Sequence, residues 1–169
     1  MARLSPYLAS AMAVSCIALL AYALYMEFVS GLVPCALCLA QRAMFALIAA
    51  ACLLYLLPSY RFRLVCALTA LIGSVLGIWL AARQLWLQSL PPDQVPACGP
   101  DIYFLIERFP LTESLGTLLL GSGSCAEVQW TFLGLSIPGW TLLWFIAMAL
   151  GSLWIGAARG ARPFRLFTD

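Results

Sequence analysis

Residues 34–60 read PCALCLAQRAMFALIAAACLLYLLPSY, and no residue from position 43 to position 60 carries a charge. A transmembrane helix needs about 20 consecutive, mostly apolar residues. Three further uncharged stretches have a similar length: 7–26, 64–82 and 140–158. These runs are continuously apolar instead of alternating over about ten residues, so helices are expected and barrel strands are not. The pattern predicts an all-α membrane protein, a single-domain bundle of four transmembrane helices over residues 1–169.

The composition excludes several classes of protein. Of the 169 residues, 64% are hydrophobic and 9% are charged, whereas about 25% are charged in an average soluble domain. This balance excludes a disordered chain and a secreted miniprotein, and a net charge of +2 without a basic stripe argues against nucleic-acid binding. The chain has no histidine, so chemistry must use thiols, carboxylates, arginine or a bound cofactor.

The arginines predict how the chain lies in the membrane. Six of the nine fall on one side of a four-span arrangement: Arg3, Arg61, Arg63, Arg159, Arg162 and Arg165. Positively charged residues are enriched in cytoplasmic segments, so both termini are expected in the cytoplasm. In a bacterial inner membrane, two loops at about 27–42 and 83–139 would then face the periplasm. Apolar patches in the long loop, such as 130–135, either lie on the membrane surface or pack against the bundle.

The seven cysteines separate into two groups by position. Three lie inside predicted spans, where a thiol normally serves as a small apolar side chain: Cys16, Cys52 and Cys66. Four lie in the predicted outer loops: Cys35, Cys38, Cys98 and Cys125. Disulfides persist in an oxidising periplasm, and four cysteines allow three pairings. The spacing favours Cys35 with Cys38 and Cys98 with Cys125.

Cys35 and Cys38 form a Cys-x-x-Cys motif, whose closely spaced thiols suit reversible exchange better than a permanent crosslink. Pro34 is typical of a first helical turn, so the motif is expected to open the second helix beside the positive end of its dipole. Arg42 follows Cys38 by one helical turn, on the same face. It is the expected partner for a thiolate or an anionic cofactor, unless it only extends toward lipid phosphates.

Two thiol pairs on one side of a membrane indicate a relay in which electrons pass from pair to pair. No nucleotide-binding or haem-attachment motif occurs, so a quinone dissolved in lipid is the expected electron acceptor. Taken alone, the second pair is better explained as a structural disulfide of the long loop. One alternative to the relay is therefore a non-catalytic membrane protein with structural disulfides. A reductive thiol transporter is the second alternative. No metal is predicted, because the second pair lacks the short spacing of zinc ligands.

A set of motifs runs through the predicted outer loops: Pro34-Cys35-Ala36-Leu37-Cys38, Gln41-Arg42, Cys98, Arg108-Phe109-Pro110, Cys125-Ala126-Glu127, Gln129-Trp130 and Phe132-Leu133-Gly134-Leu135. Together with the four spans, this set resembles the DsbB family, disulfide bond formation protein B, over almost the whole chain. The resemblance implies a quinone-reducing protein-disulfide oxidoreductase of the bacterial inner membrane, which drives disulfide bond formation in exported proteins.

The resemblance also implies a role for each outer cysteine. Cys98 and Cys125 would receive electrons from a reduced periplasmic DsbA-like thioredoxin-fold oxidase, with Cys98 in the mixed disulfide. Cys125 would then attack Cys35 and release Cys38 as a thiolate. In the family, the cysteine at the Cys38 position forms a charge-transfer complex with ubiquinone, assisted by the arginine at the Arg42 position. Ubiquinone is the expected cofactor, with menaquinone as the alternative.

Two positions depart from the family pattern. Some relatives have a histidine near the quinone site at the outer end of the third span, and this chain has none. Proton transfer there is expected to use water or another group. Gln41 stands where some relatives have an acidic residue, so the charge next to Arg42 differs.

Overall fold

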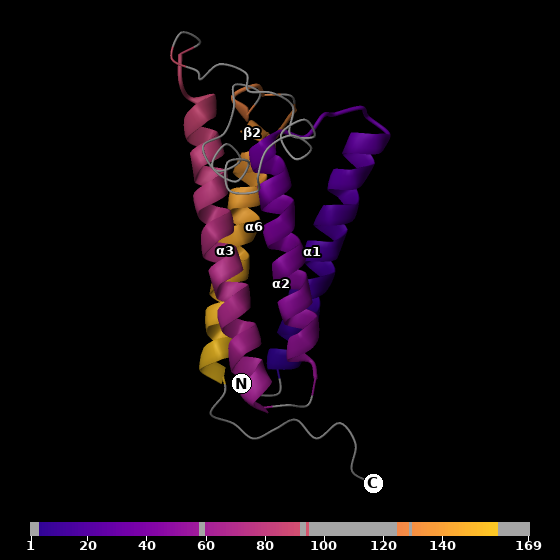
Figure 1. Cartoon of the computed structure of the whole chain (residues 1–169), viewed down its shortest axis with the longest axis vertical. Helices are drawn as coiled ribbons and strands as arrows, with labels where there is room; N and C mark the ends of the chain where they lie inside the picture. Colours follow the sequence, from indigo (N-terminus) through magenta and orange to yellow (C-terminus); the bar gives the residue numbers. More distant parts are fainter. Residues whose placement is uncertain (1–3, 58–59, 92–93, 95–124, 129, 159–169) are drawn as a thin grey trace, which may run out of the picture.

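The computed structural model describes residues 4–57, 60–91, 94, 125–128 and 130–158, and the side chains of these residues except 60 and 61. The described residues form four long helices, α1 (Ser5–Phe28), α2 (Ala36–Tyr55), α3 (Tyr60–Gln88) and α6 (Ile137–Ala157) (Figure 1). All four are long and apolar enough to cross a membrane. The predicted fold class, a four-helix membrane bundle, is therefore confirmed.

Successive helices run in opposite directions along the bundle. The start of α1 and the end of α6 lie at the bottom of Figure 1, beside the end of α2 and the start of α3. The start of α2, the end of α3 and the start of α6 lie at the opposite end, which we call the cysteine end. This arrangement brings together three segments that are far apart in the sequence: 35–42, 84–88 and 136–141. The cytoplasmic location of the termini stays a prediction.

The helices do not end where the uncharged stretches end. The stretch 43–60 is divided between two helices, since α2 ends at Tyr55 and α3 begins at Tyr60. α3 continues past residue 82 to Gln88, and α2 begins upstream of Arg42, at Ala36. An uncharged run marks the part of a helix that suits hydrocarbon, whereas backbone hydrogen bonds continue through polar residues at a helix end. Residues 83–88 and 137–139, which were predicted to belong to the long loop, are therefore helical.

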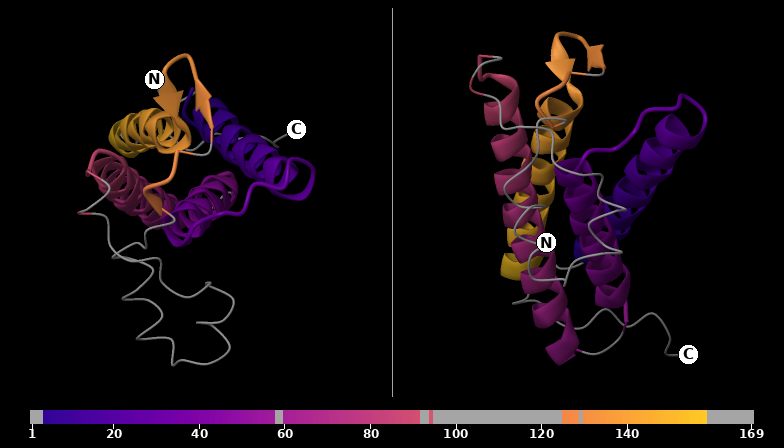
Figure 2. Two further views of the ribbon diagram at one scale, coloured as in Figure 1. Left: turned by 90° about the horizontal axis from the view of Figure 1, so that it is seen from above. Right: turned by 45° about the horizontal axis from the view of Figure 1, so that its top comes forward.

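Helix α3 packs along both α2 and α6, while α1 packs mainly on α2 and diverges from the bundle toward the cysteine end (Figure 2). In the core, the rings of Phe45 and Phe145 stack with centroids 4.1 Å apart. Gly77 of α3 allows this packing, because a Cβ atom there would overlap the ring of Phe145. Small residues permit such close approach between membrane helices. Three thiols are buried in the same core: Cys16, Cys52 and Cys66.

A short antiparallel hairpin precedes α6, with β1 (Thr131–Phe132) paired to β2 (Leu135–Ser136). Its two turn residues both have positive φ, 52° at Leu133 and 80° at Gly134. Positive φ at both central residues defines the type I′ turn, whose twist matches that of the two strands.

The hairpin rests on the first turn of α6. The indole N–H of Trp140 donates a hydrogen bond to the carbonyl of Phe132, and the Phe132 ring contacts the rings of both Trp130 and Trp140. The patch 130–135 therefore packs on the bundle, which was one of the two predicted alternatives. Phe132 and Leu133 remain exposed on its outer side, and their contact with a membrane surface stays a prediction.

Candidate active site

The Cys-x-x-Cys motif opens α2, as predicted. Cys35 is the N-cap residue, with φ −76° and ψ 168°, and the first helical residue is Ala36. Pro34 therefore precedes the cap instead of occupying the first turn, because Cys35 keeps the extended backbone of a cap residue. The Sγ atoms of Cys35 and Cys38 are 3.1 Å apart, and the Cys35 thiol donates to Cys38. Cys38 accepts this hydrogen bond at the positive end of the helix dipole.

Cys125 lies beside Cys35. It is fully buried and belongs to a cluster with Cys35 and Leu37 of the helix start and with Leu80 and Leu87 of α3. Hydrogen bonds with Cys125 and with Cys38, followed by burial, raise the pKa of the Cys35 thiol above its ordinary value. Cys35 therefore stays protonated near neutral pH. Cys98, the fourth predicted site cysteine, lies outside the described residues.

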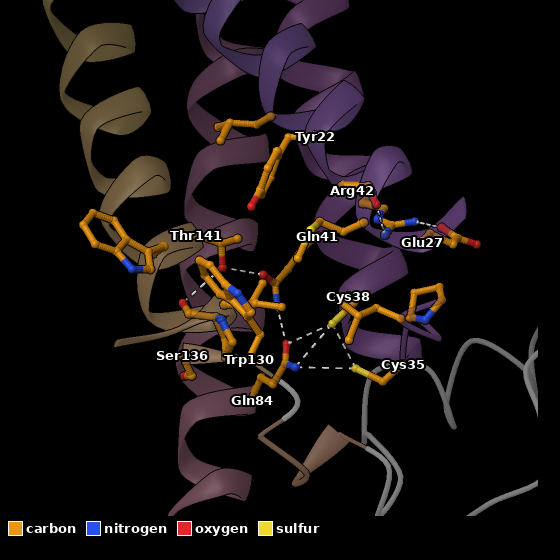
Figure 3. A pocket seen from close by; sticks show the side chains of 18 of the residues that line it. Tyr22, Glu27, Cys35, Cys38, Gln41, Arg42, Gln84, Trp130, Ser136 and Thr141 are labelled. Atoms are coloured by element: carbon orange, nitrogen blue, oxygen red, sulfur yellow. Dashed lines mark hydrogen bonds and ion pairs between the residues drawn. The ribbon is translucent and has the colours of Figure 1, made fainter. Parts of the chain in front are cut away.

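A chain of buried polar side chains reaches the sulfurs from the bundle (Figure 3). The Nε2 atom of Gln84 lies 3.4 Å from Sγ of Cys38 and 3.5 Å from Sγ of Cys35. Gln41 donates from its own Nε2 to Oε1 of Gln84 at 2.7 Å, and the Thr141 hydroxyl donates to Oε1 of Gln41 at 2.6 Å. These hydrogen bonds link α6, α2 and α3, and they end at the Cys-x-x-Cys motif.

Arg42 makes its contacts on α1. It forms an ion pair with Glu27 and donates a hydrogen bond to the carbonyl of Ala23 at 3.0 Å. Figure 3 shows its guanidinium turned toward Glu27, while the amide of Gln84 is directed at Cys38. We predicted that Arg42 stabilises the Cys38 thiolate, and this role stays a prediction. In this structure the side chain that donates an N–H group to Cys38 is Gln84.

Three of these residues were not identified from the sequence: Glu27, Gln84 and Thr141. The third span was predicted to end at residue 82, which assigned Gln84 to the long loop. A usable signal was present, since Gln41 and Gln84 are polar residues at the ends of otherwise apolar segments. Their pairing depends on which helices become neighbours, and that information is not local.

A cavity of about 320 Å³ opens between α1, α2, the end of α3, α6 and the hairpin. Its wall includes Cys35, Cys38, Arg42 and Gln84, and the rest of the lining is mostly aliphatic and aromatic. Small-molecule sites are typically apolar cavities of about 300–1,000 Å³ with a few polar groups that orient the ligand. The motif, the arginine and the linked amides therefore line one cavity that suits a small, mostly apolar molecule.

Comparison with known proteins identifies the family. The model of the family described as disulfide bond formation protein DsbB matches residues 5–155. The chain is 52% identical to disulfide bond formation protein B of Hahella chejuensis over 130 residues, which cover 76% of this chain and 79% of that protein. It is 48% identical to the protein of the same name from Nitrosococcus oceani over 141 residues, which cover 82% and 83% of the two chains. With its four membrane-spanning helices and its cysteine motif, the chain belongs to the DsbB family of protein-disulfide oxidoreductases.

Proposed function

We propose that this enzyme, placed in the bacterial inner membrane, oxidises a periplasmic DsbA-like thioredoxin-fold protein and passes the electrons to a membrane quinone. The partner would then introduce disulfide bonds into exported proteins. One observation carries the proposal: Cys35 makes hydrogen bonds with both Cys125 and Cys38, and Cys35 and Cys38 line a mostly apolar cavity. Electrons held as thiols can move between sulfurs in such contact by thiol–disulfide exchange and leave at the cavity.

In the proposed reaction, electrons enter at Cys98. A thiolate of the partner attacks Cys98 in an oxidised Cys98–Cys125 pair, and Cys125 leaves as a thiolate. Cys125 then attacks Cys35 in an oxidised Cys35–Cys38 pair, and Cys38 leaves in turn. The partner's second thiol displaces Cys98 and closes the partner's own disulfide.

The cycle then returns to its starting state. Cys98 recovers its bond to Cys125 by displacing Cys35. Cys35 and Cys38 now hold two electrons and two protons as a dithiol. Cys35 and Cys38 would then close their disulfide and give both electrons and both protons to the acceptor that the cavity would hold, for which a quinone supplies the two-electron chemistry. One partner dithiol is oxidised for each quinone reduced.

The residues of the cavity fit a quinone head group. Phe45 and Trp144 contribute flat apolar surface, and Arg42 and Gln84 carry N–H donors of the kind that quinone carbonyls accept. A bound quinone supplies a two-electron acceptor that dissolves in lipid. Ubiquinone is the proposed acceptor, with menaquinone as the alternative. The residues of this chain would bind it, orient it and hold the Cys38 sulfur against it.

Membership of the family excludes the non-catalytic alternative. A reductive thiol transporter would need a second set of thiols that can be reached from the other side of the membrane. The remaining described cysteines are closed within the core, with exposed fractions of 0%, 3% and 4% for Cys16, Cys52 and Cys66. This burial favours the proposed direction, in which electrons leave into the membrane.

The proposal is tested by mixing the purified protein with a reduced DsbA-like partner and ubiquinone-1 and following quinone absorbance. We expect equimolar oxidation of partner and reduction of quinone. The variants Cys98→Ser and Cys38→Ser should abolish turnover, whereas Cys66→Ala, which changes a buried core thiol, should retain it. Absence of quinone reduction in the unmodified protein, or unchanged turnover in Cys98→Ser, would overturn the proposal.

A further inference from the structure

We propose that Gln84 is a catalytic residue whose side-chain N–H stabilises the Cys38 thiolate, with Gln41 and Thr141 as positioning residues that fix the direction of its amide. The inference rests on the proposed function, in which Cys38 leaves as a thiolate during each turnover. It assigns a role to Gln84, which contacts the reacting sulfur of Cys38 and belongs to none of the sequence motifs.

The first argument is the geometry at Cys38. Its sulfur accepts the thiol of Cys35 at 3.1 Å and lies 3.4 Å from Nε2 of Gln84. Both contacts are within hydrogen-bonding range for sulfur, and both strengthen when the acceptor becomes an anion. Arg42 is occupied by Glu27 and by the carbonyl of Ala23. Within the part of the chain that the structure describes, Gln84 therefore provides the side-chain N–H donor at this sulfur.

The second argument is the direction of the amide. A glutamine side chain has a donor end and an acceptor end, and only the donor end stabilises a thiolate. The acceptor end, Oε1 of Gln84, accepts the Nε2 group of Gln41 at 2.7 Å and, at the longer distance of 3.8 Å, the neutral thiol of Cys38. Once Cys38 has lost its proton, only the contact from Nε2 of Gln84 at 3.4 Å remains a hydrogen bond to this sulfur. Gln41 is held in turn by the hydroxyl of Thr141, which lies 2.6 Å from its Oε1 and 3.0 Å from the carbonyl of Pro138. The shorter contact assigns the hydroxyl proton of Thr141 to Gln41. Gln41 then donates to Gln84, and the Nε2 group of Gln84 faces the sulfurs of Cys38 and Cys35.

The third argument is burial. Gln41 and Gln84 are each 3% exposed, so water does not compete for their hydrogen bonds. Reversing one amide would leave two acceptors or two donors facing each other in a buried site, and an unsatisfied buried group costs about 1–3 kcal/mol. Gln84 belongs to α3, Gln41 to α2 and Thr141 to α6. The direction of the Gln84 amide is therefore set by the packing of three helices.

The test is the pH profile of Cys38 alkylation in the reduced protein, measured with iodoacetamide and peptide mass spectrometry. Removing the amide in Gln84→Leu should raise the midpoint pH by about one unit, which corresponds to about 1.4 kcal/mol. Ser74→Ala is the matched control, because Ser74 is a buried polar residue of the same helix whose hydroxyl bonds to the carbonyl of Ala70. This control should leave the midpoint unchanged.

Gln41→Glu tests the positioning role with almost no change in shape. A carboxylate at position 41 accepts but does not donate, so the Gln84 amide should turn and present its oxygen to Cys38. The midpoint should then rise at least as far as in Gln84→Leu. Thr141→Val changes the most exposed of the three side chains and is the variant to use where the others do not fold. It should raise the midpoint pH by less than Gln84→Leu does.

The outcomes separate this inference from the proposed function. An unchanged midpoint in Gln84→Leu, or in Thr141→Val where Gln84→Leu does not fold, overturns the role of Gln84. An unchanged midpoint in Gln41→Glu overturns the positioning role. The quinone assay on the unmodified protein is independent of both results. If that assay fails while the midpoint still shifts, the proposed function is wrong and the stabilisation of Cys38 by Gln84 stands.

Discussion

Cys125 and Cys35 are hydrogen-bonded to each other at the cysteine end of the bundle, although one precedes the hairpin and the other caps α2. The contact is buried in a cluster that includes Leu80 and Leu87. Formation of a bond between these two sulfurs therefore requires no large displacement of either residue, which is the geometry that exchange between two thiol pairs needs.

Trapping this bond is the first prediction. The double variant Cys38→Ser, Cys98→Ser removes the other predicted partner of each sulfur, and mild oxidation with diamide should then join Cys35 to Cys125 in most molecules. Peptide mapping under non-reducing conditions detects the bridge. The further change Cys125→Ala should eliminate it. If Cys35 is recovered mainly as a free thiol, or bonded to another cysteine, the contact between Cys35 and Cys125 is contradicted.

The second prediction concerns pH. Hydrogen bonds with Cys125 and Cys38, together with burial, raise the pKa of Cys35. A raised pKa keeps the thiol neutral at a pH where an ordinary cysteine is partly ionised, and only the thiolate reacts with iodoacetamide. Between pH 7 and pH 9, Cys35 of the reduced protein should therefore be alkylated at least about tenfold more slowly than an unperturbed thiol, since each pKa unit is a factor of ten in thiolate.

Removal of one hydrogen-bond partner provides the control for this pH effect. In Cys125→Ala the pKa of Cys35 should fall, and alkylation at pH 8 should become several-fold faster. Rates measured by mass spectrometry at three or four pH values separate a change in ionisation from a change in access, because a change in access alone shifts all rates by one factor. A uniform shift would show that the pKa of Cys35 does not depend on Cys125.

The third prediction concerns packing of the bundle. A Cβ atom at Gly77 would overlap the ring of Phe145, whereas one at Gly156 would meet no atom within 4 Å. Gly77→Ala should lower the free energy of unfolding by about 1–3 kcal/mol, the usual effect of overpacking. Gly156→Ala should be neutral or slightly stabilising, since alanine is favoured over glycine in helices by about 1 kcal/mol. Thermal unfolding in detergent measures both.

The comparison of the two alanine variants is itself informative. Both substitutions add the same methyl group to a helix, so the difference between them reports the contact with Phe145. Equal stabilities would mean that the stacked rings of Phe45 and Phe145 can shift without loss, and that the close approach of α3 to α6 is not needed for stability.

Much of the fold was predictable from the sequence because hydropathy acts locally. Each apolar run must enter the bilayer as a helix wherever its neighbours lie, so four helices follow from the runs themselves. The Cys-x-x-Cys motif at the start of α2 was predictable for the same reason, since proline and the following apolar run mark a helix start within a few residues. The family motifs predicted the site cysteines without any knowledge of their neighbours, and their roles stay a prediction.

The ends of the helices were less predictable, because the charged residues that interrupt an apolar run do not interrupt backbone hydrogen bonding. Arg42 and Arg83 both lie inside helices, on the far side of the boundaries that the uncharged stretches indicated. Assigning residues 83–88 to a loop removed Gln84 from the predicted site.

The sequence by itself determined the four long helices of the described residues and their order, and it predicted which thiols react, because these depend on residues within one segment. Only the tertiary structure decided that Arg42 pairs with Glu27, that Cys125 contacts Cys35 and that Gln84 faces Cys38. Each of these contacts joins segments that are distant in the chain. The direction of a buried amide depends on every donor and acceptor around it, and those neighbours are set only when the helices pack together.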